Sequence, residues 1–456
     1  MPFGYQPKLT PPAAILSKWA LPFGVYRSID GVYSTDFNIA SVKPNGANIY
    51  YVDPQNSIGT ASDANAGTAP STALLSLSVA LAKANCDQVV IQGLTSDFVA
   101  RGTAGWGGVA SVARSIAVTN TTGFRFISAK SDSVVNAWSV NGTYPKVYQN
   151  ARNSVPVQVV DTATLRFNNN RKAGTNNTAA FYTHTLVGSI AAVAATPGSW
   201  FDDGTNTYIR PITDRVVPSN DKAIVLVQSG GFNGVSAGGS GLTCYVEGVD
   251  FVGGSSAFLE NQASAQTGRI LAFKNCTFQA STLNNGLTVA SFATCYLQDC
   301  WACYNYQDGF NYHSFESNGV TLGTSPKVLE VNCIAVRNGT TGSAGASDNA
   351  STSHDDCTVV RINGHYNQCD DRTVADINFS RSWMLGSYIG DAIQSWSGTS
   401  ECITGLDSSQ IYLDGCEVKS LIANYQVNVT SSAAVFIRNM ATTTLTKTGA
   451  GTLATY

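Results

Sequence analysis

Residues that could carry acid–base chemistry concentrate in one stretch of the sequence, from 304 to 396. Three of the four histidines fall there, together with two adjacent aspartate pairs, Asp355-Asp356 and Asp370-Asp371. Cleavage of a glycosidic bond requires two carboxyl groups roughly 5–9.5 Å apart, one to donate a proton and one to act as base or nucleophile. Glu316, Asp355 and Asp356 are therefore our candidate catalytic residues.

The same stretch offers side chains that could hold a sugar. Aromatic faces stack on the apolar faces of sugar rings, and arginine pairs with carboxylates. Each also has an alternative role: an aromatic ring can belong to the core, an arginine can pair with a neighbouring aspartate, and a loop aspartate can bond to its own backbone. The candidate glycan-binding residues are Tyr312, His313, His354, His365, Arg372, Trp383 and Trp396.

A short repeated phrase predicts how these residues are positioned. It alternates polar residues with apolar residues or cysteine, as a strand with one buried face does, and the steps from Val249 to Cys276, Cys300 and Cys333 are 27, 24 and 33 residues. Such recurrence is typical of a solenoid, in which stacked turns bury one continuous core. We therefore expect a parallel β-helix, with these cysteines on one inner wall. The copies span 247–251, 274–278, 298–302, 331–335 and 414–418.

Composition narrows the classes of partner. Charged residues make up 12% of the chain, and the net charge is −3 with no basic cluster, so nucleic acid is a poor candidate. A surface of serine, threonine, asparagine and glycine offers the neutral hydrogen-bonding groups that suit carbohydrate. The same residues are also favoured in the turns of β-proteins, with no ligand involved.

The eleven cysteines are an odd number without a disulfide framework, so we expect buried free thiols. Cys300-x-x-Cys303 has no matching pair, and no calcium-loop spacing is present, so we expect neither a metal nor a cofactor. The N-terminus lacks the pattern of a secretory signal, and no apolar run is long enough to cross a membrane.

The chain divides into three predicted parts. Residues 1–47 are rich in proline and aromatic residues, and we expect either a cap of the solenoid or an anchor to a larger assembly. Residues 48–422 form the β-helix, with a helix near 71–85 and long insertions in the early coils between 95 and 240. Residues 423–456 form a β-rich cap or trimer tip.

The start of the β-helix carries a family resemblance. A strand at 49–52, a polar loop, a helix with Leu74, Leu77 and Leu81 on one face, and a strand at 88–91 resemble the beginning of pectate-lyase-like proteins. In that type a helix covers the open end, where unpaired strand edges would otherwise invite aggregation. The resemblance implies an all-β, right-handed parallel β-helix with a short N-terminal capping α-helix.

Together with the proline-rich start and the β-rich tail, this architecture resembles phage tailspikes and related virion spikes. The resemblance implies a homotrimer that recognises host cell-surface polysaccharide (capsule or lipopolysaccharide) and in many cases depolymerises it. Residues 1–47 would then attach the spike to the virion, and the protein would be made in the host cytoplasm and act outside on the particle. Two alternatives stay open: a stand-alone polysaccharide lyase or glycoside hydrolase, and an adhesive fibre without a glycan cleft.

Overall fold

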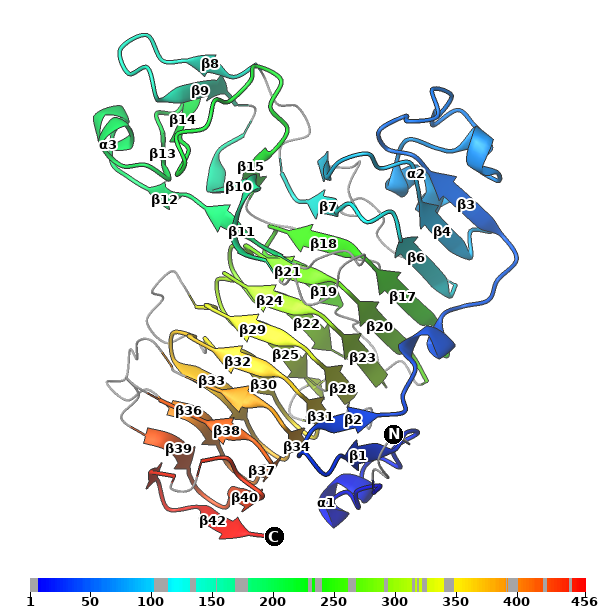
Figure 1. Cartoon of the computed structure of the whole chain (residues 1–456), viewed down its shortest axis with the longest axis vertical. Helices are drawn as coiled ribbons and strands as arrows, with labels where there is room; N and C mark the ends of the chain where they lie inside the picture. Colours follow the sequence, from blue (N-terminus) through cyan, green and yellow to red (C-terminus); the bar gives the residue numbers. More distant parts are fainter. Residues whose placement is uncertain are drawn as a thin grey trace.

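A computed structural model gives the architecture of the chain (Figure 1). None of the helices in the described part is long and apolar enough to cross a membrane. The structure describes residues 7–101, 114–131, 137–152, 154–168, 179–228, 232–233, 240–260, 268–290, 294–313, 316–317, 320–321, 326–339, 348–390, 392, 401–420, 425–442 and 445–456.

Three parallel sheets enclose one continuous core, and we call this β-helical body the shaft. Successive strands of the chain pass from the first sheet to the second and then the third. The predicted all-β parallel β-helix is therefore confirmed. Sheet A has twelve strands: β3 (Ile49–Val52), β4 (Gln88–Ile91), β6 (Ile116–Asn120), β17 (Thr243–Glu247), β20 (Ile270–Lys274), β23 (Thr294–Gln298), β28 (Lys327–Val331), β31 (Thr358–Ile362), β34 (Arg381–Leu385), β37 (Gln410–Asp414), β40 (Ala434–Arg438) and β42 (Thr452–Thr455).

Sheets B and C have nine strands each. Sheet B contains β5 (Phe98–Arg101), β7 (Phe126–Ala129), β18 (Val249–Val252), β21 (Thr277–Gln279), β24 (Trp301–Cys303), β29 (Ile334–Val336), β32 (His365–Asn367), β35 (Tyr388–Ile389) and β38 (Glu417–Val418). Sheet C contains β16 (Phe232–Asn233), β19 (Ser256–Glu260), β22 (Leu287–Ala290), β25 (Phe310–His313), β30 (Ser351–Ser353), β33 (Arg372–Asp376), β36 (Glu401–Gly405), β39 (Tyr425–Val429) and β41 (Lys447–Thr448).

The repeated phrase marks the corner where the chain leaves sheet A for sheet B. The residue at this corner adopts a left-handed backbone in coil after coil, as in Asn275, Asp299 and Asn332, whose φ angles are 51°, 55° and 52°. Asparagine, aspartate and glycine tolerate that conformation best, which explains their place in the phrase. The cysteine that follows points inward: Cys276, Cys300 and Cys333 are fully buried in one core, and the thiol of Cys300 lies 3.4 Å from the carbonyl oxygens of Phe273 and Gln298.

The shaft interior is filled by apolar ladders. Around Phe278, the rings of Phe251, Phe273 and Phe310 lie with centroids 5.6, 5.0 and 6.4 Å away. All eleven cysteines are buried free thiols, as the sequence predicted.

A short helix closes the N-terminal end of the shaft. The helix α2 (Leu77–Ala82) lies beside β3 and β4, and its buried Leu77, Ala80 and Leu81 complete the core there. The predicted capping helix is confirmed and is shorter than the 71–85 range. At the other end, β39 to β42 continue the parallel ladders of sheets A and C.

Residues 7–47 lie along the outer face of sheet A, and we call them the N-terminal strap (Figure 1). The strap contains α1 (Ala13–Leu16), β1 (Val25–Arg27), β2 (Tyr33–Thr35) and the 3-10 helix η1 (Ile39–Val42). Its Ile15, Trp19 and Phe23 form one cluster with Tyr296 and Trp383 of sheet A. The strap therefore covers apolar side chains that the coils direct outward.

The described residues between 137 and 228 lie in the part of the chain, 95–240, where the sequence predicted long insertions in the early coils. They form a mostly antiparallel unit with its own core, which includes Trp138 and Trp200. We call this the insertion unit. Its elements are β8 (Ser139–Val140), β9 (Tyr148–Ala151), β10 (Pro156–Asn168), β11 (Ala179–Thr183), β12 (Thr185–Leu186), α3 (Ile190–Ala195), β13 (Ser199–Asp202), β14 (Asn206–Arg210) and β15 (Ile224–Gln228).

Truncation of a ring in the shaft tests this packing. Phe278 is fully buried, so Phe278→Ala should lower the free energy of unfolding by about 3–5 kcal/mol through lost burial and a residual cavity. Phe379→Ala is the matched control, because that ring is 60% exposed, and its effect should stay within about 0.5 kcal/mol. Denaturant titration followed by circular dichroism measures both. Equal shifts for the two variants would contradict the stacked core.

Candidate functional site

Several of the predicted site residues meet at one edge of the β-helix, where the chain turns from sheet C to sheet A. His313 ends β25, residues 354–356 form the turn between β30 and β31, and Phe379 lies in the turn between β33 and β34. Because β25, β30 and β33 are neighbours in sheet C, these turns lie one above another. We call the group of His313, His354, Asp355, Asp356, Phe379 and Arg381 the edge cluster.

Two histidines stack in the edge cluster. The ring centroids of His313 and His354 are 4.1 Å apart with an interplanar angle of 12°, and the His313 side chain is 37% exposed. Burial, with the charge of His313 as a smaller cause, lowers the pKa of His354 to about 3. His354 is therefore a neutral imidazole at neutral pH, and His313 is the member of the pair that faces solvent.

The adjacent aspartates have different environments. Asp356 accepts from Lys18 Nζ of the strap at 2.9 Å and from an Arg381 guanidinium nitrogen at 2.7 Å. Two cations favour its ionised form, which suits an electrostatic role better than that of a proton donor. Asp355 is 9% exposed, and its Oδ2 lies 3.9 Å from His313 Nδ1. A carboxyl beside an exposed imidazole is an arrangement that supports proton transfer.

Phe379 is the member of the edge cluster that our sequence analysis missed. Its side chain is 60% exposed, while its backbone N–H donates to the Asp355 carbonyl at 2.7 Å, and its carbonyl accepts from Arg381 at 2.9 Å. A fixed, exposed ring among polar groups can stack on a flat apolar partner. One signal was available in the sequence, because Phe379 follows Asn378 in a polar turn, outside the strand alternation.

Two candidate glycan-binding residues are closed to a ligand. Tyr312 points into the shaft, fully buried, and its hydroxyl donates to Glu330 Oε1 at 2.9 Å. Trp383 points outward from sheet A, but the strap covers it completely. We therefore remove both from the candidate site, because neither presents any surface to solvent.

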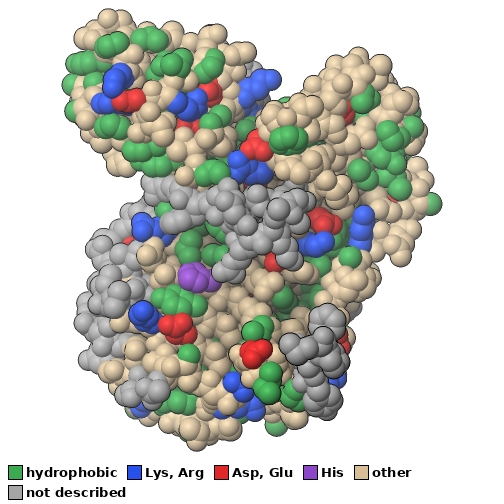
Figure 2. Space-filling model, viewed as in Figure 1, with side chains coloured by type: hydrophobic (Ala, Val, Ile, Leu, Met, Phe, Trp, Pro, Cys, Tyr) green, Lys and Arg blue, Asp and Glu red, His purple; other side chains and the backbone are tan. Residues whose placement is uncertain are grey.

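The remaining candidates are spread over other surfaces. His365 lies on the outer face of sheet B and stacks on Tyr388, with centroids 4.7 Å apart; Figure 2 shows a histidine on this face with charged side chains nearby. Arg372 pairs with Asp371 at 3.2 Å and Glu401 at 3.3 Å. Trp396 lies outside the described residues. Glu316 belongs to β26 (Glu316–Ser317), which pairs with β27 (Val320–Thr321), and its side chain lies outside the described residues.

A buried ionic network lies inside the shaft next to the edge cluster. Arg361 is fully buried between Glu330, at 3.4 Å, and Asp376, at 3.5 Å. Ser353 and Ser382 donate to the two oxygens of Asp376. Arg361 therefore pairs with two carboxylates in the interior, and Arg381 pairs with Asp356 at the edge cluster.

A second group of carboxyls lies where sheet B turns toward sheet C. Burial raises the pKa of Asp308 to about 7, and burial together with nearby aspartates raises that of Asp348 to about 8. Both oxygens of Asp348 are buried without a hydrogen-bond partner among the described residues. Among all the residues that the structure describes, no three histidine, cysteine or carboxylate side chains are arranged to hold a metal ion.

Comparison with known proteins supports the fold. No protein-family model and no curated protein sequence matches the chain. A solved complex of XylC with xylose has a TM-score of 0.50 and 10% identity over 85% of this chain and 68% of that one, a likeness of fold alone. Pectate lyase Pel9A gives a TM-score of 0.37 with 14% identity over 88% and 79% of the two chains. The tailspike gp49 from Pseudomonas phage LKA1 gives 0.25, with 12% identity over 83% and 70%.

The predicted resemblance to parallel β-helices of these kinds is thus confirmed at the level of the fold, which the strand pairing of the chain itself establishes. The TM-scores of the pectate lyase and the tailspike are too low to support an inference about activity. The function must therefore be argued from the residues of this chain.

The buried carboxyls predict a dependence of stability on pH. An unfolded aspartate releases its proton near pH 4, whereas Asp308 and Asp348 hold theirs to about pH 7 and 8. The free energy of unfolding should therefore fall as pH rises from about 4 to these two folded-state values. Between pH 6.5 and 8 the loss should be about 1 kcal/mol for Asp308 and roughly twice as much for Asp348, whose higher pKa keeps it protonated over more of this range. His354 opposes this loss by a few tenths of a kcal/mol at about pH 6.5, because an unfolded imidazole is then about half protonated whereas the buried one is neutral.

Denaturant midpoints at pH 6.5 and pH 8 measure this slope. Asp348→Asn should reduce the slope by more than half, because an amide does not titrate while Asp308 still does, whereas the exposed Asp30→Asn should leave it unchanged. A midpoint that rises with pH in the wild-type chain would contradict the proposed proton uptake on folding.

Proposed function

We propose that this chain is the β-helix of a virion spike that binds host cell-surface polysaccharide. The observation that carries the proposal is the edge cluster, in which the backbone of the exposed Phe379 bonds to Asp355 and Arg381, and the Asp355 carboxylate lies 3.9 Å from His313. An aromatic face can stack on a sugar ring while carboxylate, imidazole and guanidinium groups bond to its hydroxyls. Parallel coils hold these groups on a rigid scaffold, which reduces the entropy lost on binding.

The chemistry of the surface supports a glycan as the ligand. Charged residues are 12% of the chain, and the two cations at the edge cluster, Arg381 and Lys18 of the strap, are already paired with Asp356. A hydroxyl-rich polymer fits such a surface better than a nucleic acid does. His365, stacked on Tyr388 on the outer face of sheet B, and Arg372, at the corner between sheets B and C, stay proposed as separate glycan contacts on other surfaces.

Attachment to a particle and assembly into a homotrimer belong to the same proposal. The inner side of the strap is occupied by sheet A, so an attachment contact has to use its outer side. There the turn between β1 and β2 exposes Ile29 by 94% and Val32 by 61%, two apolar side chains available to a partner. Light scattering tests the assembly: a trimer supports the spike, and an active monomer favours the stand-alone enzyme.

The pairing of Asp355 with His313 favours a second function at the same site, the cleavage of the bound glycan. The two groups could exchange a proton with the glycosidic oxygen or with a water molecule. Asp356, held by two cations, would stabilise positive charge that develops on the sugar ring. Glu316, on sequence grounds, stays proposed as a further carboxyl for this reaction.

Binding to purified capsule or lipopolysaccharide of the host tests the site. Phe379→Ala should weaken the affinity about tenfold, equivalent to about 1.4 kcal/mol, because the stacking face is lost. Leu283→Ala is the control, since Leu283 is 57% exposed on a turn elsewhere in the coils. Biolayer interferometry with immobilised polymer gives the dissociation constants. The same affinity for Phe379→Ala and wild type would remove the edge cluster from the binding site.

Cleavage is measured in the same mixtures by the size of the polymer over time. If the wild-type chain shortens the glycan, Asp355→Asn should slow the release of oligosaccharides at least about 100-fold, with binding retained, because an amide cannot take up the proton. Wild-type activity in Asp355→Asn would exclude Asp355 as a catalytic residue. An intact polymer with the wild-type chain would leave a binding protein without depolymerase activity.

A further inference from the structure

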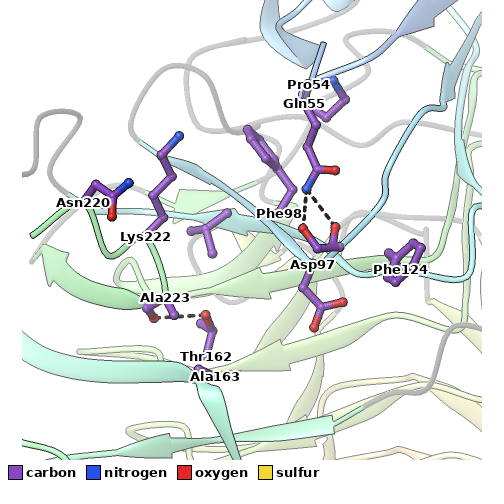
Figure 3. A pocket seen from close by; sticks show the side chains of 12 residues that line it. Pro54, Gln55, Asp97, Phe98, Phe124, Thr162, Ala163, Asn220, Lys222 and Ala223 are labelled. Carbon is purple, nitrogen blue, oxygen red and sulfur yellow. Dashed lines mark hydrogen bonds between the residues drawn. The ribbon is translucent and has the colours of Figure 1, made fainter. Parts of the chain in front are cut away.

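A cleft of about 770 Å³ lies between the first coils and the insertion unit, several coils away from the edge cluster. Its size is within the range of small-molecule sites, about 300–1,000 Å³. Figure 3 shows Gln55, Phe98 and Phe124 on the side of the coils, with Asn220, Lys222 and Thr162 of the insertion unit opposite. No local sequence pattern predicts this cleft, because its walls include residues more than 100 positions apart, such as Gln55 and Lys222.

The wall from the coils is fixed in place. Gln55 bonds to Thr95 and Ser96 through both ends of its amide, at 2.8 to 3.0 Å. Asp97 forms an ion pair with Arg125 and also accepts from the Arg125 backbone N–H at 2.9 Å. These polar groups have partners already, so what this wall offers to a ligand is chiefly aromatic surface.

Two phenylalanine rings supply that surface. Phe98 is partly buried and stacks on Phe126, with centroids 6.0 Å apart. Phe124 is 40% exposed in the turn before β7. A ring that is held from behind and open in front can pack against the apolar face of a ligand.

The opposite wall supplies an available cation. Arg101 donates to the carbonyls of Lys222 and Ile224, which fixes the backbone on which Lys222 is carried. The Lys222 side chain is exposed, and within the described part of the chain its ammonium group has no carboxylate partner. The side-chain amide of Asn220 likewise makes no hydrogen bond to a described residue. Both groups can therefore bond to a ligand without breaking an existing contact.

The charge around the cleft is positive. Its lining holds one cation, Lys222, and one acidic side chain, Asp97, whose charge is offset by Arg125, while Asp221 beside Lys222 is offset by Arg215. In a chain with a net charge of −3, this local excess of cations favours an anionic ligand. Aromatic faces beside a cation and an amide suit a ring with one apolar face, hydroxyl groups and an acidic group.

We propose that this cleft is a binding site for an acidic sugar, with the sugar carboxylate on Lys222, hydroxyls on Asn220 and the ring face on Phe124 and Phe98. The site is separate from the edge cluster and does not depend on the function proposed for it. It would give the chain a second contact with a polymer that contains uronic acids, and two linked contacts raise the overall affinity for one polymer.

Saturation-transfer NMR with the full chain tests the site. The probes are D-glucuronate and D-galacturonate, each compared with its neutral parent, glucose or galactose, at equal concentration. The uronates should give signals about fivefold stronger, the factor expected for one solvent-exposed charge-assisted contact. Lys222→Ala should reduce them to the level of the neutral sugars, and Lys222→Arg should retain most of the gain. Phe124→Ala should weaken all four sugars.

Lys447→Ala serves as the control, because Lys447 lies on β41 near the other end of the shaft. It should leave the uronate signals unchanged. In Phe379→Ala the gain of the uronates over the neutral sugars should persist, which separates this site from the edge cluster. Signals no stronger for uronates than for neutral sugars would overturn the proposal, and so would uronate signals unaffected by Lys222→Ala. Loss of the signals in Phe379→Ala would assign the uronate to the edge cluster instead.

Discussion

Stacking of the coils in register is the constraint on which the rest of this structure depends. One coil is too thin to bury its own inner face, so each inward side chain is covered by its equivalent in the next coil. The ladder of Cys276, Cys300 and Cys333 and the rings around Phe278 are products of this repetition. The same repetition brings turns together that are far apart in sequence, and the edge cluster arises in this way from residues 313, 354–356 and 379.

Apolar side chains that point outward from the coils are not covered by the stacking. The strap and the insertion unit cover them instead. Trp383 and Tyr296 on the outer face of sheet A are covered by the strap, and Trp301 on sheet B is packed against Ala180 of the insertion unit. The strap also reaches the edge cluster through Lys18, which bonds to Asp356. The covering segments therefore contribute to both candidate sites, since the insertion unit provides one wall of the Lys222 cleft.

The sequence predicted the repeated coils but not the contacts of the segments that cover their outer faces. The phrase around Cys276, Cys300 and Cys333 predicted the parallel coils and the buried thiols, because alternation and spacing record strand burial directly. The alternation of Phe310 and Tyr312 as inward residues, with His313 outward, was also readable, yet we expected Tyr312 at the surface. Trp383 looked accessible because its cover comes from a strap more than 300 residues earlier in the sequence, and no local pattern encodes that contact. The Lys222 cleft was missed for the same reason.

The buried Arg361 network connects the interior of the shaft to the edge cluster. Burial of three charges costs free energy that their mutual attraction does not fully offset, so packing alone would favour apolar side chains there. The network joins β28, β31 and β33, and the bond from Ser353 to Asp376 ties the end of β30 to that of β33. His354 follows Ser353 directly, and Phe379 lies three residues after Asp376. An apolar interior would tolerate small shifts between these coils, whereas directional hydrogen bonds fix one register. We infer that the network holds His354 and Phe379 at a constant spacing, which a site assembled from separate turns requires.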